Sequence, residues 1–403
     1  MTDVVKVADE AGLVEAVRAA IEAGKTLDVC GRGSKRDLGR PGQTDWTLDL
    51  SALAGVTLYE PEELILSAKG GTPVAEIEAM LKERGQMLAF EPLDYGPLLG
   101  GAEAAGSIGG VVACNLAGPR RISHGAARDH ALGARAVSGR AEAFKSGGRV
   151  VKNVTGYDLP RLLAGSYGTL AVLSEFTLKV LPRPPMEETV VLPGVSPEAA
   201  AKALSAAMGS SCEVSGAAYL PGPVAARIPE LKLDVPAVVL RLEGFEPSVR
   251  ARRAMMISVL MPFGGVEVVE TAASPGLWAS IRDVRPFVGT GARAVWRLST
   301  APAAGPALAA RLAEQFKGET FCDWAGGLIW LLMPGEASEA DKVRAALAPH
   351  GGHATLVRAT SAERAAVPVF QPMEPTLAAL TQRVKASFDP MGVLNPGRMY
   401  AGM

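Results

Sequence analysis

Two glycine-rich stretches that lie far apart in the sequence have the composition of phosphate-binding loops. They are Gly31-Arg32-Gly33-Ser34-Lys35 and Gly106-Ser107-Ile108-Gly109-Gly110. Because glycine has no Cβ, consecutive backbone N–H groups in such loops can approach a phosphate closely and offer it partial positive charge. Either stretch alone is equally consistent with an ordinary tight turn. Together, set among strand-like sequence and followed by the run at 152–158, they indicate one extended dinucleotide bound from several sides.

The first stretch does not match the two common nucleotide-binding motifs. It follows a strand-like segment at 26–30, but Arg36 occupies the third glycine position of a Rossmann fingerprint. The next ordered pattern, at 46–50, alternates like a strand and not like a helix. The sequence also contains no GxxxxGK[ST] string, so a P-loop nucleotide triphosphatase loses its main support.

The overall composition narrows the class of partner. The 403 residues include 41 basic and 42 acidic side chains, so no net field attracts nucleic acid or an anionic membrane. We therefore expect a small-molecule or protein partner and no nucleic acid. The four cysteines, Cys30, Cys114, Cys212 and Cys322, form no CxxC pair, which argues against a disulfide framework, a zinc site or an iron–sulfur cluster in this chain. No leader segment or transmembrane segment is apparent, so we expect a cytoplasmic protein.

Helical and strand-like patterns alternate before a proline-rich boundary. Apolar residues recur at helical spacing between Asp9, a predicted cap, and Gly24. Strand-like segments follow at 26–30, 46–50 and 64–68, and the period-two pattern from Leu170 to Val180 predicts a further strand. The prolines at 181–185 forbid its continuation and mark a domain boundary. Residues 186–380 mix helices, such as 307–316, with strands, such as 294–298 and 328–333, which predicts an α+β second domain.

Several longer strings resemble a known family, the flavoproteins with a vanillyl-alcohol-oxidase or PCMH-type FAD-binding domain. The strings are Gly31-Arg32-Gly33-Ser34, the stretch from Gly106 to Ala113, Gly125-x-x-Arg128-Asp129-x-x-Leu132-Gly133 and Leu394-Asn395-Pro396-Gly397. Within that family, Gly118 to Arg121 and Lys152 to Leu159 are similar to the FAD-binding E subunits of bacterial glycolate oxidases. The resemblance implies an α+β fold with a two-subdomain FAD-binding domain at 1–181, an α+β cap domain at 186–380 and a C-terminal segment at 381–403 that returns to the flavin.

The resemblance also implies the residues of the cofactor site. The pyrophosphate would be held by Arg32, Gly33, Ser34 and Lys35 of the first loop and by Gly106, Ser107, Gly109 and Gly110 of the second. Arg128 and Asp129 would brace the second subdomain near the cofactor, and Asn395 would face the flavin. Many relatives tether FAD through a histidine in the first loop, but this loop offers Ser34 and Lys35, and no cysteine immediately precedes Gly106. We therefore predict non-covalent FAD.

Oxidation of a 2-hydroxy acid needs a cation for the carboxylate, a base for the hydroxyl proton and the flavin as hydride acceptor. Residues 278–282 are similar to the segment in which the family carries its carboxylate-binding arginine, so Arg282 is the candidate, with Arg285 behind it. A structural or solvated arginine is an equally good interpretation.

Other candidate groups are weaker. The stretch 322–330 has tryptophans where the catalytic members of the family carry histidines for a metal and a base. His350 and His353 flank two glycines in a predicted loop, and isolated histidines usually have structural or surface roles. We therefore predict no metal site and leave the base unidentified. His124 and His130 are consistent with lining the cofactor pocket or with a structural role.

For function, the resemblance implies the FAD-binding subunit of a glycolate oxidase complex, which oxidises glycolate or related 2-hydroxy acids to 2-oxo acids. Its partners would be a catalytic flavin subunit and an iron–sulfur subunit, and its own FAD would be a redox or electron-relay centre. It would reach the inner membrane only through that complex. Two alternatives stay open: a stand-alone FAD-dependent D-2-hydroxyacid dehydrogenase, and an assembly subunit that FAD merely stabilises.

Overall fold

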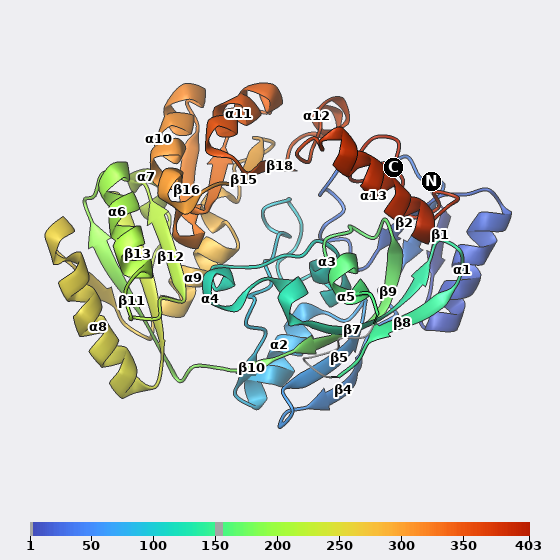
Figure 1. The fold of residues 1–403 in the computed structure, drawn as a ribbon, viewed down its shortest axis with the longest axis horizontal. Helices are drawn as coiled ribbons and strands as arrows, with labels where there is room; N and C mark the ends of the chain where they lie inside the picture. The colour runs from blue at the N-terminus through green and yellow to red at the C-terminus, as the bar shows by residue number, and fades with distance from the viewer. Residues whose placement is uncertain (1–2, 150–155) are drawn as a thin grey trace. The chain divides into compact units, whose positions relative to one another are not determined.

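The computed structural model describes residues 3–149 and 156–403, which fall into two compact units (Figure 1). The first unit consists of Met1–Ala117, Gly125–Arg183 and Pro372–Met403. The second consists of Gly118–His124 and Pro184–Gln371. The short segment Gly118–His124, which carries part of the family-like sequence, is therefore counted with the second unit, although the chain on both sides of it belongs to the first.

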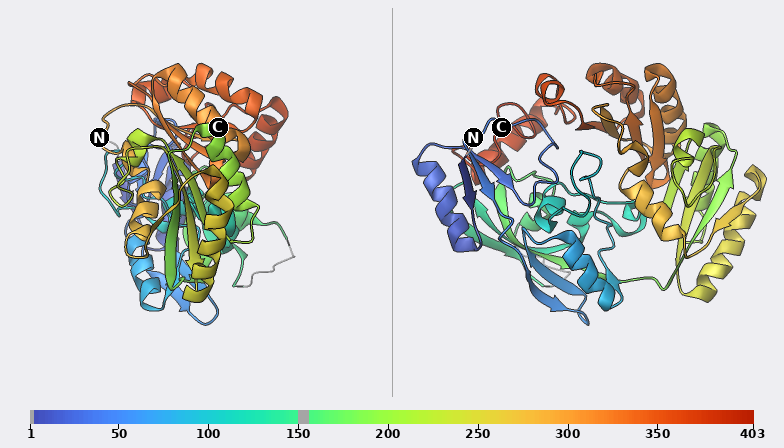
Figure 2. Two further views of the ribbon diagram at one scale, coloured as in Figure 1. Left: turned by 90° about the vertical axis from the view of Figure 1, so that its left-hand side faces the viewer. Right: turned by 180° about the vertical axis from the view of Figure 1, so that it is seen from behind.

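The first unit begins with a small parallel sheet of three strands in the order β1-β3-β2. Its helix is the one predicted from the apolar spacing, and Leu13 and Val17 are fully buried in a core cluster shared with the sheet. Figure 2 shows this helix, in blue, near the N-terminus. The side chain of Asp9 accepts a hydrogen bond from Gly12 N–H at 2.7 Å, which confirms the predicted N-cap. The elements are β1 (Asp3–Lys6), α1 (Glu10–Glu22), β2 (Leu27–Cys30) and β3 (Trp46–Asp49).

A second sheet of this unit has five antiparallel strands in the order β4-β5-β9-β7-β8. Strand β9 is the predicted period-two strand and ends at Lys179; after Val180, residues 181–182 pair with β6 in a separate ribbon. The strands are β4 (Val56–Glu60), β5 (Ile65–Lys69), β6 (Gln86–Met87), β7 (Ala131–Ser138), β8 (Ala143–Gly147), β9 (Ala171–Lys179) and β10 (Leu181–Pro182). The helices are α2 (Val74–Glu83), α3 (Ile108–Ala113), the 3-10 turn η1 (Ala127–His130) and α5 (Leu159–Leu163).

The chain returns to the first unit through α13 (Pro375–Phe388). The residues after this helix pair with the first sheet, since Leu394 forms a parallel bridge with Leu27. Lys385, which is buried, holds the segment in place by donating hydrogen bonds to Thr169 O at 2.7 Å and Leu394 O at 2.9 Å. The C-terminal segment is thus part of the first sheet's edge.

The second unit is built on one antiparallel sheet of eight strands in the order β14-β11-β13-β12-β16-β17-β15-β18. Helices α6, α8 and α10 pack against it (Figure 1). The strands are β11 (Met186–Pro193), β12 (Gly216–Leu220), β13 (Ala237–Gly244), β14 (Glu267–Val269), β15 (Val295–Ser299), β16 (Glu319–Asp323), β17 (Leu328–Leu332) and β18 (His353–Arg358). The helices are α4 (Arg121–His124), α6 (Pro197–Met208), α7 (Gly222–Ala225), α8 (Glu246–Leu260), α9 (Ser274–Arg282), α10 (Gly305–Phe316), α11 (Ala340–Leu347) and α12 (Ser361–Ala366). Of the helices in residues 3–149 and 156–403, none has the length and apolar character needed to cross a lipid bilayer.

Candidate functional site

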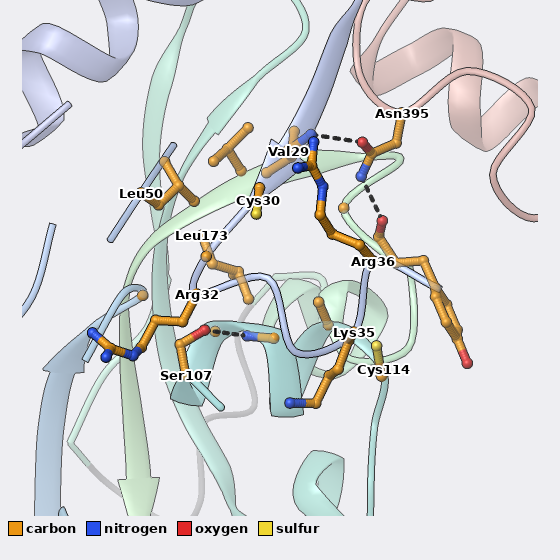
Figure 3. A pocket seen from close by; sticks show the side chains of 18 of the residues that line it. Val29, Cys30, Arg32, Lys35, Arg36, Leu50, Ser107, Cys114, Leu173 and Asn395 are labelled. Carbon is orange, nitrogen blue, oxygen red and sulfur yellow. Dashed lines mark hydrogen bonds between the residues drawn. The ribbon is translucent and has the colours of Figure 1, made fainter. Parts of the chain in front are cut away.

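A pocket of about 780 Å³, part of it open to solvent, lies within the first unit (Figure 3). Both predicted loops line it, together with residues 166–168 and the C-terminal segment. Of the predicted cofactor residues, those at the pocket are Arg32, Gly33, Ser34, Lys35, Ser107, Gly109, Gly110 and Asn395.

The two loops touch each other at glycines. A Cβ added to Gly31 would clash with the Ser107 hydroxyl, and a Cβ added to Gly109 would clash with the carbonyl oxygen of Gly70. Gly70 lies in the turn after β5, where the sequence shows only a Gly-Gly turn signal. At Gly109, backbone therefore packs directly on backbone, which only glycine permits.

The backbone N–H groups of the first loop are available for a ligand. Within the part of the chain that the structure describes, the N–H groups of Gly31, Arg32, Gly33, Ser34 and Lys35 donate to no protein acceptor. Consecutive unbonded N–H groups of this kind form an anion-binding concavity. The expectation that the first loop offers its amides is therefore consistent with the geometry.

The second loop is used differently from the sequence-based expectation. Its Ile108 and Gly109 N–H groups donate to Thr72 O and Gly70 O, both at 2.9 Å. Ser107 caps α3, and its hydroxyl accepts from Gly110 N–H at 3.4 Å. These three amides serve the protein's own fold, because the loop must turn from a bridge with Pro73 into a helix. Gly106, which does not line the pocket, accepts from Val74 N–H at 3.0 Å.

Lys35 brings a buried positive charge to the pocket. Only 9% of the residue is exposed, and its ammonium bonds to the Ser34 hydroxyl at 3.1 Å. Among residues 3–149 and 156–403, no carboxylate lies within ion-pair distance of this ammonium. Burial lowers the pKa of Lys35, and the neighbouring Cys114 and Asp94 oppose this effect. A buried cation without a counter-ion is costly, so the site suits an anionic ligand.

Asn395 lines the pocket, but its side chain bonds to the backbone. Its Oδ1 accepts from Val29 N–H and its Nδ2 donates to Tyr167 O, each at 2.8 Å (Figure 3). The residue has a left-handed φ of 43°, which asparagine tolerates better than most side chains. Asn395 thus joins β2 to the loop at 166–168.

Arg398 also belongs to the site and was missed in the sequence. Its guanidinium donates to Lys35 O at 2.9 Å and forms an ion pair with the Asp28 carboxylate at 3.6 Å. Arg398 therefore connects the first loop to β2. The sequence feature that could have identified Arg398 is its position directly after the family-like Leu394-Asn395-Pro396-Gly397 string.

Arg128 and Asp129 do not line the pocket. The N–H of Arg128 donates to Asn115 Oδ1 at 3.0 Å, and the Asp129 carboxylate accepts from Ala126 N–H at 2.9 Å. They order the turn η1 beside Asn115, whose neighbour Cys114 does line the pocket. The Asp129 carboxylate thus acts as a local cap of the turn, while Arg128 contributes its backbone N–H to the Asn115 side chain.

The candidate arginines for the substrate carboxylate lie in the second unit. Arg282 ends α9, and its guanidinium forms two hydrogen bonds with the Asp283 carboxylate, at 2.8 and 2.7 Å. Its charge is therefore matched by the next residue. Arg285 begins a 3-10 turn after α9, and Trp278, Trp296 and Trp330 are fully buried in the core.

Neither candidate histidine near the flavin-family strings lines the pocket. His130 is buried in the first unit against the ring of Phe90, and His124 in the second unit contacts Ser123 through Nδ1 at 2.8 Å. Of the predicted run at 152–158, residues 152–155 lie outside the described residues.

Comparison with known proteins shows which family the chain resembles. A family profile described as "FAD binding domain" matches residues 2–147. The chain is 37% identical over 390 residues to glycolate oxidase subunit GlcE of Escherichia coli (strain K12), covering 96% of this chain and 97% of that protein. It is 30% identical over 171 residues to glycolate oxidase subunit GlcD of Bacillus subtilis (strain 168), covering 41% of this chain and 36% of that protein.

A solved structure shows the same fold. p-Cresol methylhydroxylase aligns with a TM-score of 0.73 at 12% sequence identity, over 99% of this chain and 88% of that one. The predicted PCMH-type α+β fold class is confirmed.

Proposed function

The chain belongs to the family of FAD-binding glycolate oxidase subunits, and on that premise we propose that it binds FAD non-covalently in the pocket of the first unit and works within a glycolate oxidase complex. The FAD binding domain recognised at residues 2–147 contains both loops of the pocket. When bound, FAD supplies the hydride- and electron-accepting chemistry. The chain's own residues bind and orient it.

The buried ammonium of Lys35 is the observation that carries this proposal. Its Nζ lies 3.1 Å from the Ser34 hydroxyl, at the end of a loop whose five consecutive backbone N–H groups have no protein acceptor among the described residues. A diphosphate would satisfy both, because its oxygens accept hydrogen bonds and its charge neutralises the lysine. The residues present therefore fit FAD at its diphosphate.

Two cysteines line the pocket, and their chemistry supports a non-covalent cofactor. Covalent attachment through sulfur requires a thiolate. Burial raises the pKa of Cys30 and raises that of Cys114 to about 11, so both are protonated thiols at neutral pH. Neither cysteine is suited to tether the flavin.

The charges around the pocket favour the electron-relay role. Its charged lining residues are Arg32, Lys35, Arg36 and Arg398, and none of the described lining residues is a histidine, aspartate or glutamate. A general base must lie within hydrogen-bond reach of the proton it removes, and the described part of this lining contains no histidine or carboxylate to act as one. We infer that a catalytic flavin subunit oxidises the 2-hydroxy acid and that electrons pass through the FAD of this chain towards an iron–sulfur subunit.

The test uses the absorption spectrum of the purified chain, alone and co-purified with its partners. The isolated chain should be yellow and should release all its flavin on denaturation. Anaerobic glycolate should bleach the flavin of the complex and leave that of the isolated chain oxidised. Bleaching in the isolated chain with glycolate, D-lactate or D-2-hydroxyglutarate would instead establish a stand-alone dehydrogenase. If this chain's flavin stays oxidised inside the complex, the chain is an assembly subunit.

A further inference from the structure

Within the second unit, two arginines stack on one tryptophan. The guanidinium carbons of Arg121 and Arg297 lie 4.6 and 4.9 Å from the ring centroid of Trp324. His353 begins β18 and pairs with Ser299, two residues after Arg297 on β15. We call Arg121, Arg297, Trp324 and His353 the arginine–tryptophan cluster.

The backbone holds Trp324 in an unusual conformation. Trp324 and Ala325 have φ values of 52° and 55°, so two successive non-glycine residues are left-handed. Such strained positions persist only where the surroundings fix them, and they concentrate at ligand sites. Here the Trp324 ring N–H donates to Gly118 O at 3.0 Å and its backbone N–H to Asp323 Oδ1 at 2.7 Å. The ring is therefore a fixed platform for the two guanidinium groups.

Arg297 differs from the other half-buried arginines of this unit. In the part of the chain that the structure describes, its guanidinium makes no ion pair and no hydrogen bond, only the contact with Trp324. Arg282 is neutralised by Asp283, and Arg120 by Glu243 and Glu187. The charge of Arg297 has no such match.

Arg121 adds positive charge to the cluster, and His353 adds an imidazole that is neutral at pH 7. Partial burial and the nearby guanidinium groups of Arg297 and Arg121 lower the pKa of His353. The imidazole of His353 makes no hydrogen bond with the described residues, so it can donate or accept towards a ligand. The unmatched charge of Arg297 and this imidazole therefore lie in one cluster on the neighbouring strands β15 and β18.

We propose that the arginine–tryptophan cluster binds the carboxylate of a small 2-hydroxy or 2-oxo acid, in place of Arg282. This inference rests on the proposed function, which supplies the class of ligand. A planar guanidinium matches a carboxylate with two parallel hydrogen bonds, and stacking on a ring orients it in advance. The role assigned to the site is recognition of the acid through its carboxylate.

Calorimetric titration of the full chain carrying its FAD tests the proposal, with glycolate as the probe. Arg297→Gln and Arg121→Gln should each weaken glycolate binding at least tenfold, and Arg297→Lys should weaken it less. Arg282→Gln and Arg250→Gln are the matched controls and should bind as the unaltered chain does. Arg250 lies exposed on α8 and pairs with Glu246. Unaltered binding in Arg297→Gln, or loss of binding in Arg282→Gln alone, overturns the proposal.

Ligand analogues separate a carboxylate site from a general anion site. Glycolamide, which has the hydroxyl but no charge, should not bind. Inorganic phosphate should compete poorly, and equal competition by phosphate overturns the assignment to carboxylates. The FAD content and the unfolding midpoint of each variant are measured on the same samples. If a variant fails to fold, Trp324→Phe, which keeps a stacking ring, is tested in its place. A colourless chain that still binds glycolate through Arg297 supports this site and refutes the proposed function.

Discussion

The side chain of Asn395 is bonded to the backbone of Val29, 366 residues earlier in the sequence, at 2.8 Å. The same amide reaches Tyr167 O, so one side chain joins three separate segments around the pocket. The C-terminal segment thereby supports the first glycine-rich loop, which begins two residues after Val29. Several measurable consequences depend on this arrangement and on the charges nearby.

Replacing Asn395 by alanine should reduce the stability of the first unit by about 2 kcal/mol, because two backbone groups lose their partners. The FAD content of the purified variant should also fall, because β2 positions the first loop. Urea unfolding and the flavin-to-protein absorbance ratio measure both effects, with Gln382→Ala on the exposed side of α13 as control. If Asn395→Ala alters the flavin spectrum and leaves stability unchanged, its role is direct contact with the flavin and not support of the backbone.

Gly31→Ala should destabilise the chain by about 1 to 3 kcal/mol and weaken FAD binding, because the added methyl overpacks the contact with Ser107. A second substitution, Ser107→Ala, removes the hydroxyl that the methyl meets, so the double variant should lose less than the sum of the single variants. Gly148→Ala is the matched control, since a Cβ there meets nothing within 4 Å. Equal effects of Gly31→Ala and Gly148→Ala on flavin affinity would show that the contact between the loops is irrelevant to binding.

Lys35→Met should have opposite effects on the apoprotein and on the flavin complex. Burial lowers the pKa of Lys35 below the 10.5 of an exposed lysine, so its charge disfavours the folded apoprotein at neutral pH. That penalty is relieved as the pH rises towards 10.5, because the unfolded chain then holds the proton more tightly than the folded one. The variant should therefore unfold at a higher temperature without FAD and bind FAD at least tenfold more weakly. Lys35→Met with unchanged FAD affinity would contradict the assignment of Lys35 to the diphosphate.

Glu243→Gln should destabilise the second unit by about 3 to 5 kcal/mol at pH 7, because it leaves buried arginine charge unmatched. Burial disfavours the Glu243 carboxylate, but Arg241 and Arg120 outweigh it and lower the pKa to about 2. A lowered folded-state pKa stabilises the protein above the ordinary value of 4.5, and this stabilisation is lost as the pH falls from 4.5 towards 2.

Urea unfolding at a series of pH values, followed by tryptophan fluorescence, measures this loss. The control is Glu246→Gln, an exposed partner of Arg250. The same acid dependence in Glu243→Gln as in the unaltered chain would place the responsible carboxylate elsewhere.

The sequence predicts what depends on local pattern. Helix α1, strand β9 and the meeting of the two loops at one pocket all follow from spacing, glycine content and resemblance. Helix α13 was not predicted, because its one buried residue is Lys385 and no apolar stripe marks it. The use of the second loop's amides and the pairing of Arg282 with Asp283 depend on contacts in space, which periodicity does not encode. Arg297 and Trp324 meet only after β15 and the turn following β16 come together.

The bridge between Leu27 and Leu394 has a consequence for biosynthesis. Proteins are made from the N-terminus at roughly 5 to 20 residues per second, so β2 waits on the order of 20 to 70 seconds for the segment that completes its edge. During that interval the nascent chain exposes an unpaired edge of β2 beside an incomplete pocket. Flavin capture should therefore be a post-translational event, and ribosome-bound intermediates of this protein should be clients of chaperones that shield strand edges.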